Sequence, residues 1–97
     1  MLSHSVFFDL KDDADVAAFI AVLRELERIP VVQDMQVGTF ADLEDPRALS
    51  DYDVAMEIIC SEADYPIYQD HEIHDQVRAQ VGDYLNAKPA VYDYIVQ

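Results

Sequence analysis

The sequence predicts an α+β fold in which the elements follow the order strand–helix–strand–strand–helix–strand. Short segments alternate apolar and polar residues with the period of a β-strand, and longer segments repeat apolar residues at helical spacing. Prolines and acidic turn residues separate most of these segments. With 97 residues, the chain is expected to form one domain over residues 1–97.

The first strand is expected over Ser3–Leu10, with one face formed by alternating residues: His4, Val6, Phe8 and Leu10. The helix that follows repeats apolar residues at helical spacing: Val16, Phe19, Ile20, Leu23 and Leu26. Asp12 or Asp13 is expected to cap its start. Pro30 is expected to end it.

The second strand is expected over Val31–Phe40, with Gly38 as a candidate β-bulge. Residues 41–51 are acidic and contain a proline, which predicts a loop. The third strand is expected over Tyr52–Cys60. Alternation within that strand places Ile59 on the face opposite its main apolar row.

The second helix is predicted as one continuous helix that runs to near Asn86 and ends before Pro89. Residues 61–64 resemble a capping box. Pro66 fits only the first turn of a helix, so the helix is expected to start at Asp64 or Tyr65. The fourth strand is expected over Ala90–Gln97.

This order matches the ferredoxin-like split βαβ arrangement, a four-stranded antiparallel sheet with both helices on one face. The other face would be bare, and Phe7 and Ile59 make it partly apolar. Large apolar faces are uncommon on monomers. We therefore expect a homodimer in which two sheets pack face to face, a dimeric α/β barrel.

Composition limits the partners and the compartment. Six basic and twenty acidic residues give a net charge of −14, which argues against nucleic acid and anionic membranes as partners. The single cysteine, Cys60, cannot form an internal disulfide and is expected to be a core residue. The absence of a signal peptide and of a membrane-length apolar run predicts a cytoplasmic protein.

The main functional signal is a set of histidines with one tyrosine. His71, His74 and Tyr68 lie in one short segment, and His4 lies on the first strand, on the face that the helices are expected to cover. These four side chains are therefore expected to converge on a pocket between sheet and helix. Histidine titrates near neutral pH, and a tyrosine hydroxyl can donate to an oxyanion. Such a set suits proton abstraction next to a carbonyl.

Other interpretations of these residues stay open. Each histidine could be structural, bonded to backbone or capping a helix break. A metal site is a further alternative, in which His71 and His74 would be joined by carboxylates: Asp70, Glu72 and Asp75. Tyr92 and Tyr94 share a strand face and favour an interface or core role. With two glycines, a glycine-rich phosphate cradle is excluded, and no Rossmann fingerprint or Ser–His–Asp set is present.

Segments along nearly the whole chain resemble one known family: His4–Asp12, Tyr52–Ile58 with Ser61, the Tyr68-x-x-His71-x-x-His74 motif, and Val91–Tyr94. The chain resembles the stress-responsive A/B barrel (Dabb) family. The most specific motif of that family is Y-x-x-H-P-x-H, and Glu72 stands here where proline is usual. The turn before the last helix is therefore expected to be less rigid.

The resemblance implies a ferredoxin-like domain that dimerises through its sheets. Many members are known only as stress-induced proteins, and a similar plant member is a polyketide cyclase that needs no cofactor or metal. By that resemblance His74 would be the base and Tyr68 the oxyanion donor, while His4 and His71 would position a substrate.

Four functions remain open at this point. The first is a dimer of uncharacterised role with a pocket for a small apolar carbonyl compound. The second is a cofactor-free cyclase or isomerase. The third is a barrel of the related antibiotic-biosynthesis monooxygenase type, against which the spacing of Tyr68, His71 and His74 argues. The fourth is a purely structural stress protein.

Overall fold

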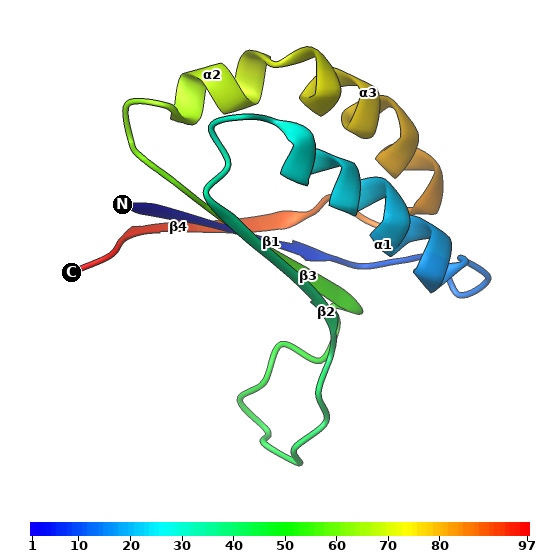
Figure 1. Cartoon of the computed structure of the whole chain (residues 1–97). Coiled ribbons are helices and arrows are strands. Elements are labelled where there is room, and N and C mark those ends of the chain that lie inside the picture. The colour runs from blue at the N-terminus through cyan, green and yellow to red at the C-terminus, as the bar shows by residue number, and fades with distance from the viewer.

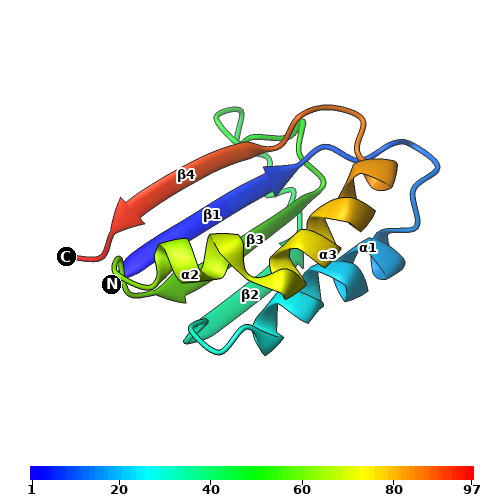
Figure 2. The same ribbon diagram turned by 90° about the horizontal axis from the view of Figure 1, so that it is seen from above.

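The computed structural model describes residues 1–97 as a four-stranded antiparallel sheet with its helices on one face, which confirms the predicted fold class (Figure 1). The strands are β1 (Leu2–Phe8), β2 (Asp34–Thr39), β3 (Val54–Cys60) and β4 (Ala90–Ile95). The helices are α1 (Val16–Arg24), α2 (Tyr65–Asp70) and α3 (Glu72–Val81), and short 3₁₀ turns follow α1 and α3: η1 (Glu25–Arg28) and η2 (Gly82–Tyr84). The strand order is β2-β3-β1-β4, so β1 and β3 are central (Figure 2).

The core lies between the helices and one face of the sheet. As predicted, His4, Val6 and Phe8 are buried on the helix face of β1. Phe19 of α1 is completely buried, and its ring lies 5.0 Å from that of Phe8. Cys60 is also fully buried, as predicted for a core residue. Burial, followed by the negative charge of Asp64, raises the pKa of the Cys60 thiol.

The start of α1 differs from the prediction. Asp15, rather than Asp12 or Asp13, caps the helix, because its side chain accepts a hydrogen bond from the backbone of Ala18 at 3.0 Å. The preceding residues form a separate turn, in which the amide of Ala14 donates to the carbonyl of Lys11. This turn moves the first helical residue to Val16.

The strands are shorter than predicted at their ends. Residues 29–32 form a turn after η1, in which the amide of Val32 donates to the carbonyl of Ile29, so β2 begins only at Asp34. The predicted bulge at Gly38 is absent, because each residue of β2 has one partner and Gly38 faces Ala55. Leu10 lies beyond the end of β1 and forms an isolated bridge with Leu85.

The second helical segment is two helices instead of one. α2 starts at Tyr65, as predicted, and Pro66 lies in its first turn. His71 then adopts an extended backbone (φ −70°, ψ 144°) between α2 and α3, which breaks the helix. This local break turns the chain between Tyr68 and His74, the two residues that the family resemblance implies as a catalytic pair.

The face of the sheet away from the helices, called here the open face, is mixed in character. Its residues fall in three cross-strand rows: Asp34–Ile59–Ser3–Tyr94, Gln36–Glu57–Ser5–Tyr92 and Gly38–Ala55–Phe7–Ala90. The carboxylate of Glu57 accepts hydrogen bonds from Ser3 at 2.8 Å and Tyr94 at 3.2 Å. The open face is therefore less apolar than Phe7 and Ile59 alone suggested.

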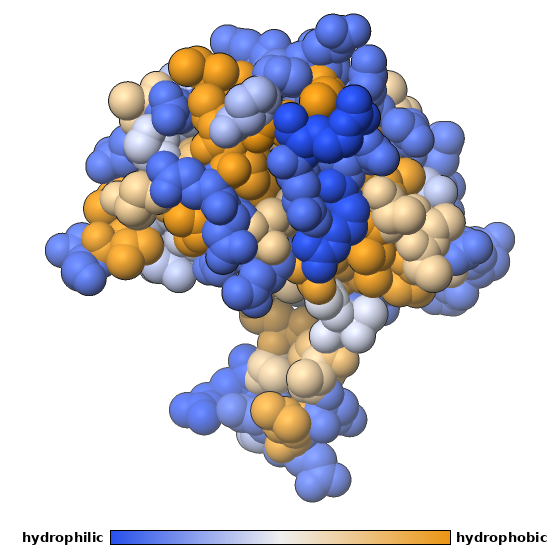
Figure 3. Space-filling model, viewed as in Figure 1, coloured by the Kyte–Doolittle hydropathy of each residue, from blue (hydrophilic) through white to orange (hydrophobic).

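The loop between β2 and β3 projects away from the body of the molecule (Figures 1 and 3). It carries exposed apolar side chains, including Leu43 and Leu49, among acidic ones. The chain termini lie close together, where the amide of Val96 donates to the carbonyl of Met1. None of the helices has the length and apolar character that crossing a membrane requires. The cytoplasmic location stays a prediction.

Candidate functional site

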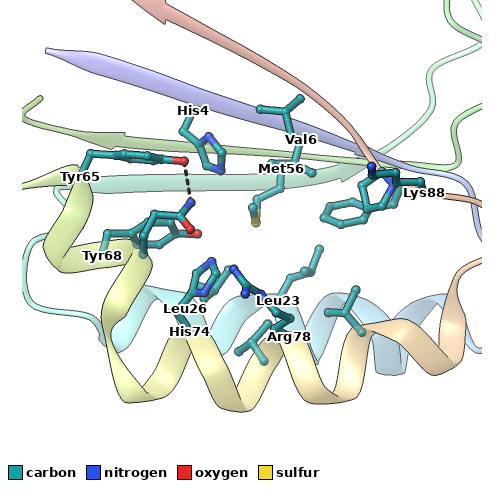
Figure 4. Close-up of a pocket in the computed structure, with 16 residues that line it drawn as sticks. His4, Val6, Leu23, Leu26, Met56, Tyr65, Tyr68, His74, Arg78 and Lys88 are labelled. Atoms are coloured by element: carbon teal, nitrogen blue, oxygen red, sulfur yellow. Dashed lines mark hydrogen bonds between the residues drawn. The ribbon is translucent and has the colours of Figure 1, made fainter.

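A pocket of about 370 Å³ opens between the helix face of the sheet and helices α2 and α3 (Figure 4). One end is formed by rings: His4, Tyr65, Tyr68 and His74. Aliphatic side chains form most of the walls: Val6, Leu23, Leu26, Met56 and Val77. Lys88 and Pro89 line the other end, where β4 begins. This volume lies within the range of small-molecule sites.

His4 is held in place from the neighbouring strand. The register of β1 and β4 places Asp93 directly opposite His4. The Nδ1–H of the imidazole donates to the Asp93 carboxylate at 2.5 Å. His4 itself is buried, with an exposed fraction of 5%. The bond to Asp93 engages Nδ1 and leaves Nε2 as the ring nitrogen without a partner in this pair.

Tyr68 lies between two histidines. Its ring is 5.0 Å from the ring of His74 and 6.0 Å from that of His4, in edge-to-face arrangements. The ring of Tyr65 contacts both Tyr68 and His4, and its hydroxyl accepts a 2.5 Å hydrogen bond from Gln69. Because α2 contributes both tyrosines and α3 contributes His74, the helix break brings these rings together over β1.

The environment keeps the imidazole of His74 and the hydroxyl of Tyr68 in their neutral forms. Burial, followed by the positive charge of Arg78, lowers the pKa of His74. Burial also raises the pKa of the Tyr68 hydroxyl well above its usual range, since the phenolate would be poorly solvated there. At neutral pH the pocket therefore presents an uncharged imidazole and a protonated phenol.

Neither candidate group is satisfied by the chain itself. His74 Nδ1 is buried and makes no hydrogen bond. The hydroxyls of Tyr65 and Tyr94 bond to other side chains, whereas the Tyr68 hydroxyl makes no such bond. Buried polar groups without partners are uncommon in proteins and often mark functional sites. This arrangement can accept a proton at His74 and donate a hydrogen bond from Tyr68.

His71 lies elsewhere. It does not line the pocket, so the predicted convergence holds for His4, Tyr68 and His74 but not for His71. Its Nδ1 accepts a hydrogen bond from the backbone amide of Ile73 at 3.1 Å, which caps the start of α3. The extended backbone of His71 turns its side chain toward this cap and away from the cavity. Its suggested role in positioning a substrate has no support in this geometry.

The metal alternative lacks a ligand set. No three His, Cys, Asp or Glu side chains converge where they could hold one ion. The two histidines of the motif belong to different environments, His71 to the helix break and His74 to the pocket. The i, i+3 spacing of His71 and His74 suggested that both could bind one metal ion, but only if they lay on the same unbroken helix.

The sequence patterns did not indicate three residues that line the pocket, Tyr65, Arg78 and Lys88, nor Asp93, which lies outside the lining and bonds His4. For Asp93 a signal existed, because pairing of the first and last strands would bring it beside the start of β1, but the register was not known. Tyr65 precedes Pro66 and was treated only as a helix start. Arg78 lies one helical turn after His74, and this i, i+4 spacing could have placed it on the same helix face.

Comparison with known proteins supports the same fold. The stress responsive A/B barrel domain model matches residues 2–96. A dimeric ferredoxin-like protein of unknown function from Thermobifida fusca has a TM-score of 0.78 at 24% identity, with 98% of this chain and 90% of that chain covered. A Dabb family protein from Mesorhizobium loti has a TM-score of 0.77 at 22% identity, with coverage of 99% and 96%.

A third solved structure is a hydroxynitrile lyase from Passiflora edulis, with a TM-score of 0.84 at 20% identity and coverage of 99% and 93%. At these identities the structures establish the shared fold alone. No curated protein matches the chain. The family match nevertheless spans almost every residue, and it agrees with the observed order of strands and helices. The chain therefore belongs to the stress responsive A/B barrel domain family.

Proposed function

We propose that this protein is a homodimer, joined through the open faces of its sheets, that binds a small apolar carbonyl compound in each protomer's pocket. The observation that carries the proposal is the open cavity of about 370 Å³ beneath His4, Tyr68 and His74. A packed interior would have favoured a purely structural role.

The lining of the pocket supports an apolar ligand with one polar end. Ten of the sixteen lining residues are hydrophobic, so the walls favour burial of an aliphatic or aromatic body. The buried Nδ1 of His74, which has no hydrogen-bond partner, lies at the ring end, where Tyr68 can donate to a carbonyl oxygen. A carbonyl compound with an apolar tail matches this distribution.

The open face supports the dimer. Tyr92 is 64% exposed and Tyr94 is 43% exposed, which is high for such large side chains. Tyrosine is enriched in protein interfaces because it combines an apolar ring with a hydrogen-bonding end. The related protein from Thermobifida fusca is described as dimeric.

Ligand titration followed by NMR tests the pocket. A panel of neutral methyl ketones and β-polyketo thioesters is added while the imidazole signals of all three histidines are recorded. We expect the signals of His4 and His74 to shift, while His71, which lies outside the pocket, serves as an internal control. Val81→Trp, which places a bulky side chain in the lining, should abolish the shifts, whereas Ile67→Trp on the exposed side of α2 should not.

The proposal fails if no compound shifts His4 or His74, or if His71 shifts as strongly as they do. It also fails if Val81→Trp binds as well as the wild-type protein does.

A second candidate function, cofactor-free proton transfer to or from the bound carbonyl compound, is favoured by the unpaired Nδ1 of His74. A neutral imidazole beside a phenol can take the proton next to a carbonyl while the phenol stabilises the enolate oxygen. His74→Gln should then abolish hydrogen–deuterium exchange at the carbon next to the carbonyl while binding persists. Unchanged exchange in that variant would refute this candidate.

A further inference from the structure

The basic side chains of this acidic protein differ in whether they bond to other groups of the chain. Only six are present against twenty acidic ones. Arg24, Arg28 and Arg47 form ion pairs with nearby carboxylates. Lys11 donates to a backbone carbonyl. Arg78 and Lys88 remain, and neither forms an ion pair or a hydrogen bond within the chain.

Both of these unpaired cations line the pocket. Arg78 comes from α3 and Lys88 from the segment that leads into β4, so two separate elements bring positive charge to one cavity (Figure 4). No aspartate or glutamate lines it. In a chain of net charge −14, a cavity with two cations and no anion in its lining is complementary to an anionic ligand.

The two cations lie at different places in the pocket: Arg78 lies next to His74, and Lys88 lies at the opposite end (Figure 4). Arg78 follows His74 by four residues, a rise of about 6 Å along α3. Asp93, which bonds His4, and Pro89, at the far end, are separated by four residues of extended chain, a length of about 13 Å. The pocket therefore offers hydrogen-bonding rings at one end and the charge of Lys88 at the other, with apolar walls between them and Arg78 on the α3 wall next to the rings.

The charge of Arg78 reaches the rings. It is the second cause, after burial, of the lowered pKa of His74, and it also opposes the rise in the pKa of Tyr68. Both effects agree with the position of Arg78 in the pocket lining, one helical turn from His74.

We propose that the pocket takes a ligand with an apolar body, a carbonyl group at one end and a carboxylate at the other. The carbonyl lies at Tyr68 and His74, and the carboxylate lies toward Lys88, where it is attracted by Lys88 and by Arg78 on the α3 wall. This rests on the proposed function, and it adds the charge and orientation of the ligand. The many acidic residues elsewhere on the surface do not prevent binding, because charges beyond about 8 Å are screened at physiological salt.

A matched pair of probes tests the proposal. One is oxodecanoate with its ketone next to the terminal methyl group, and the other is its neutral methyl ester. Dissociation constants are measured by NMR titration at low and at physiological salt. We expect the carboxylate to bind at least about fivefold more tightly than the ester at low salt, with added salt weakening only the carboxylate.

Variants locate the contact. Arg78→Gln and Lys88→Gln should each weaken the carboxylate about threefold and leave the ester unchanged. Arg47→Gln removes the same charge from the β2–β3 loop and should change neither affinity. Both cations are exposed, so these variants should keep the fold, which thermal unfolding checks.

The outcomes separate the two proposals. Equal binding of ester and carboxylate in the wild type and in both pocket variants would overturn the carboxylate site and leave the pocket proposal standing. Failure of both probes to shift His4 and His74 would count against the pocket itself. A carboxylate that binds but loses as much affinity in Arg47→Gln as in Arg78→Gln would overturn the assigned position.

Discussion

His74 joins the electrostatics of the pocket to its chemistry. Its ring is partly buried against Tyr68, and its Nδ1 has no partner in the chain. Burial and the positive charge of Arg78 both disfavour the imidazolium form, so the pKa of His74 lies below its ordinary value. A base that stays neutral at the working pH is ready to accept a proton.

The titration of His74 provides the first prediction. In an NMR pH titration, the midpoint for His74 should lie below the ordinary value of about 6.5. Arg78→Gln should move the midpoint upward only in part, because burial is the larger cause. Arg47→Gln should leave it unchanged. A His74 midpoint at or above the ordinary value would contradict the environment described for it.

The same shift links folding to pH. Because the pKa of His74 is depressed in the folded state, the unfolded chain binds a proton first as pH falls. His74 therefore contributes stability that is fully present above about pH 6.5 and is lost as pH falls through its folded-state pKa. The free energy of unfolding should decline less steeply in His74→Gln than in the wild type over that window, as measured by urea denaturation.

His71 gives the second prediction. His71→Ala should lower the free energy of unfolding by about 1 kcal/mol, because it removes the side chain that caps α3. His71→Asn should largely retain the cap, since asparagine is a favourable N-cap residue. Ligand affinity, measured by ligand titration followed by NMR, should be unchanged in both variants. A loss of affinity in the asparagine variant would instead support the substrate-positioning role that the resemblance suggested.

At the scale of elements, the break between α2 and α3 decides the shape of the site. His71 has the extended backbone that residues before proline prefer, and Glu72 is the first residue of α3. Proline is well suited to that first position because its missing amide proton would be unpaired there in any case. The local backbone is thus already compatible with the proline that the family usually carries.

The third prediction follows from this compatibility. Glu72→Pro should raise the free energy of unfolding by about 0.5 kcal/mol, mainly because proline reduces the conformational freedom of the unfolded chain. Gln76→Pro, in the interior of the same helix, should be destabilising by about 3 kcal/mol or more. Urea denaturation of both variants makes the comparison, and a destabilised Glu72→Pro would show that the break is not pre-formed for proline.

At the scale of the whole molecule, the open face is the surface through which two copies of the chain are proposed to pair. It carries Phe7, Tyr92 and Tyr94 around the hydrogen-bonded carboxylate of Glu57. The projecting β2–β3 loop adds exposed apolar side chains beside the sheet. A stable dimer normally buries about 1,200–2,000 Å² in total.

The fourth prediction tests this pairing. Sedimentation equilibrium should show a dimer for the wild-type chain and a monomer for Tyr92→Glu, because the new carboxylate would be buried near Glu57 on an already acidic face. Ile67→Glu introduces the same charge at a comparably exposed position on α2 and should remain dimeric. Dimerisation of Tyr92→Glu at the wild-type affinity would place the interface elsewhere.

The sequence alone determined the fold class and most of the helix face. Alternation identified His4, Val6 and Phe8 as one side of the first strand, because the period of two in a strand is a local property of the backbone. The start of α2 followed from the position of Pro66 for the same kind of local reason. Spacing grouped Tyr68 with the histidines, and the resemblance to the family motif singled out Tyr68 and His74 as a pair.

Only the tertiary structure decided which residues share the pocket. Asp93 meets His4 through the register of β1 and β4, and two residues 89 positions apart cannot be paired by local pattern alone. His71 leaves the set because a single extended residue breaks the helix. Arg78 and Lys88 meet the same cavity because packing brings two distant elements together, and contacts of that kind depend on how the whole chain buries its apolar surface.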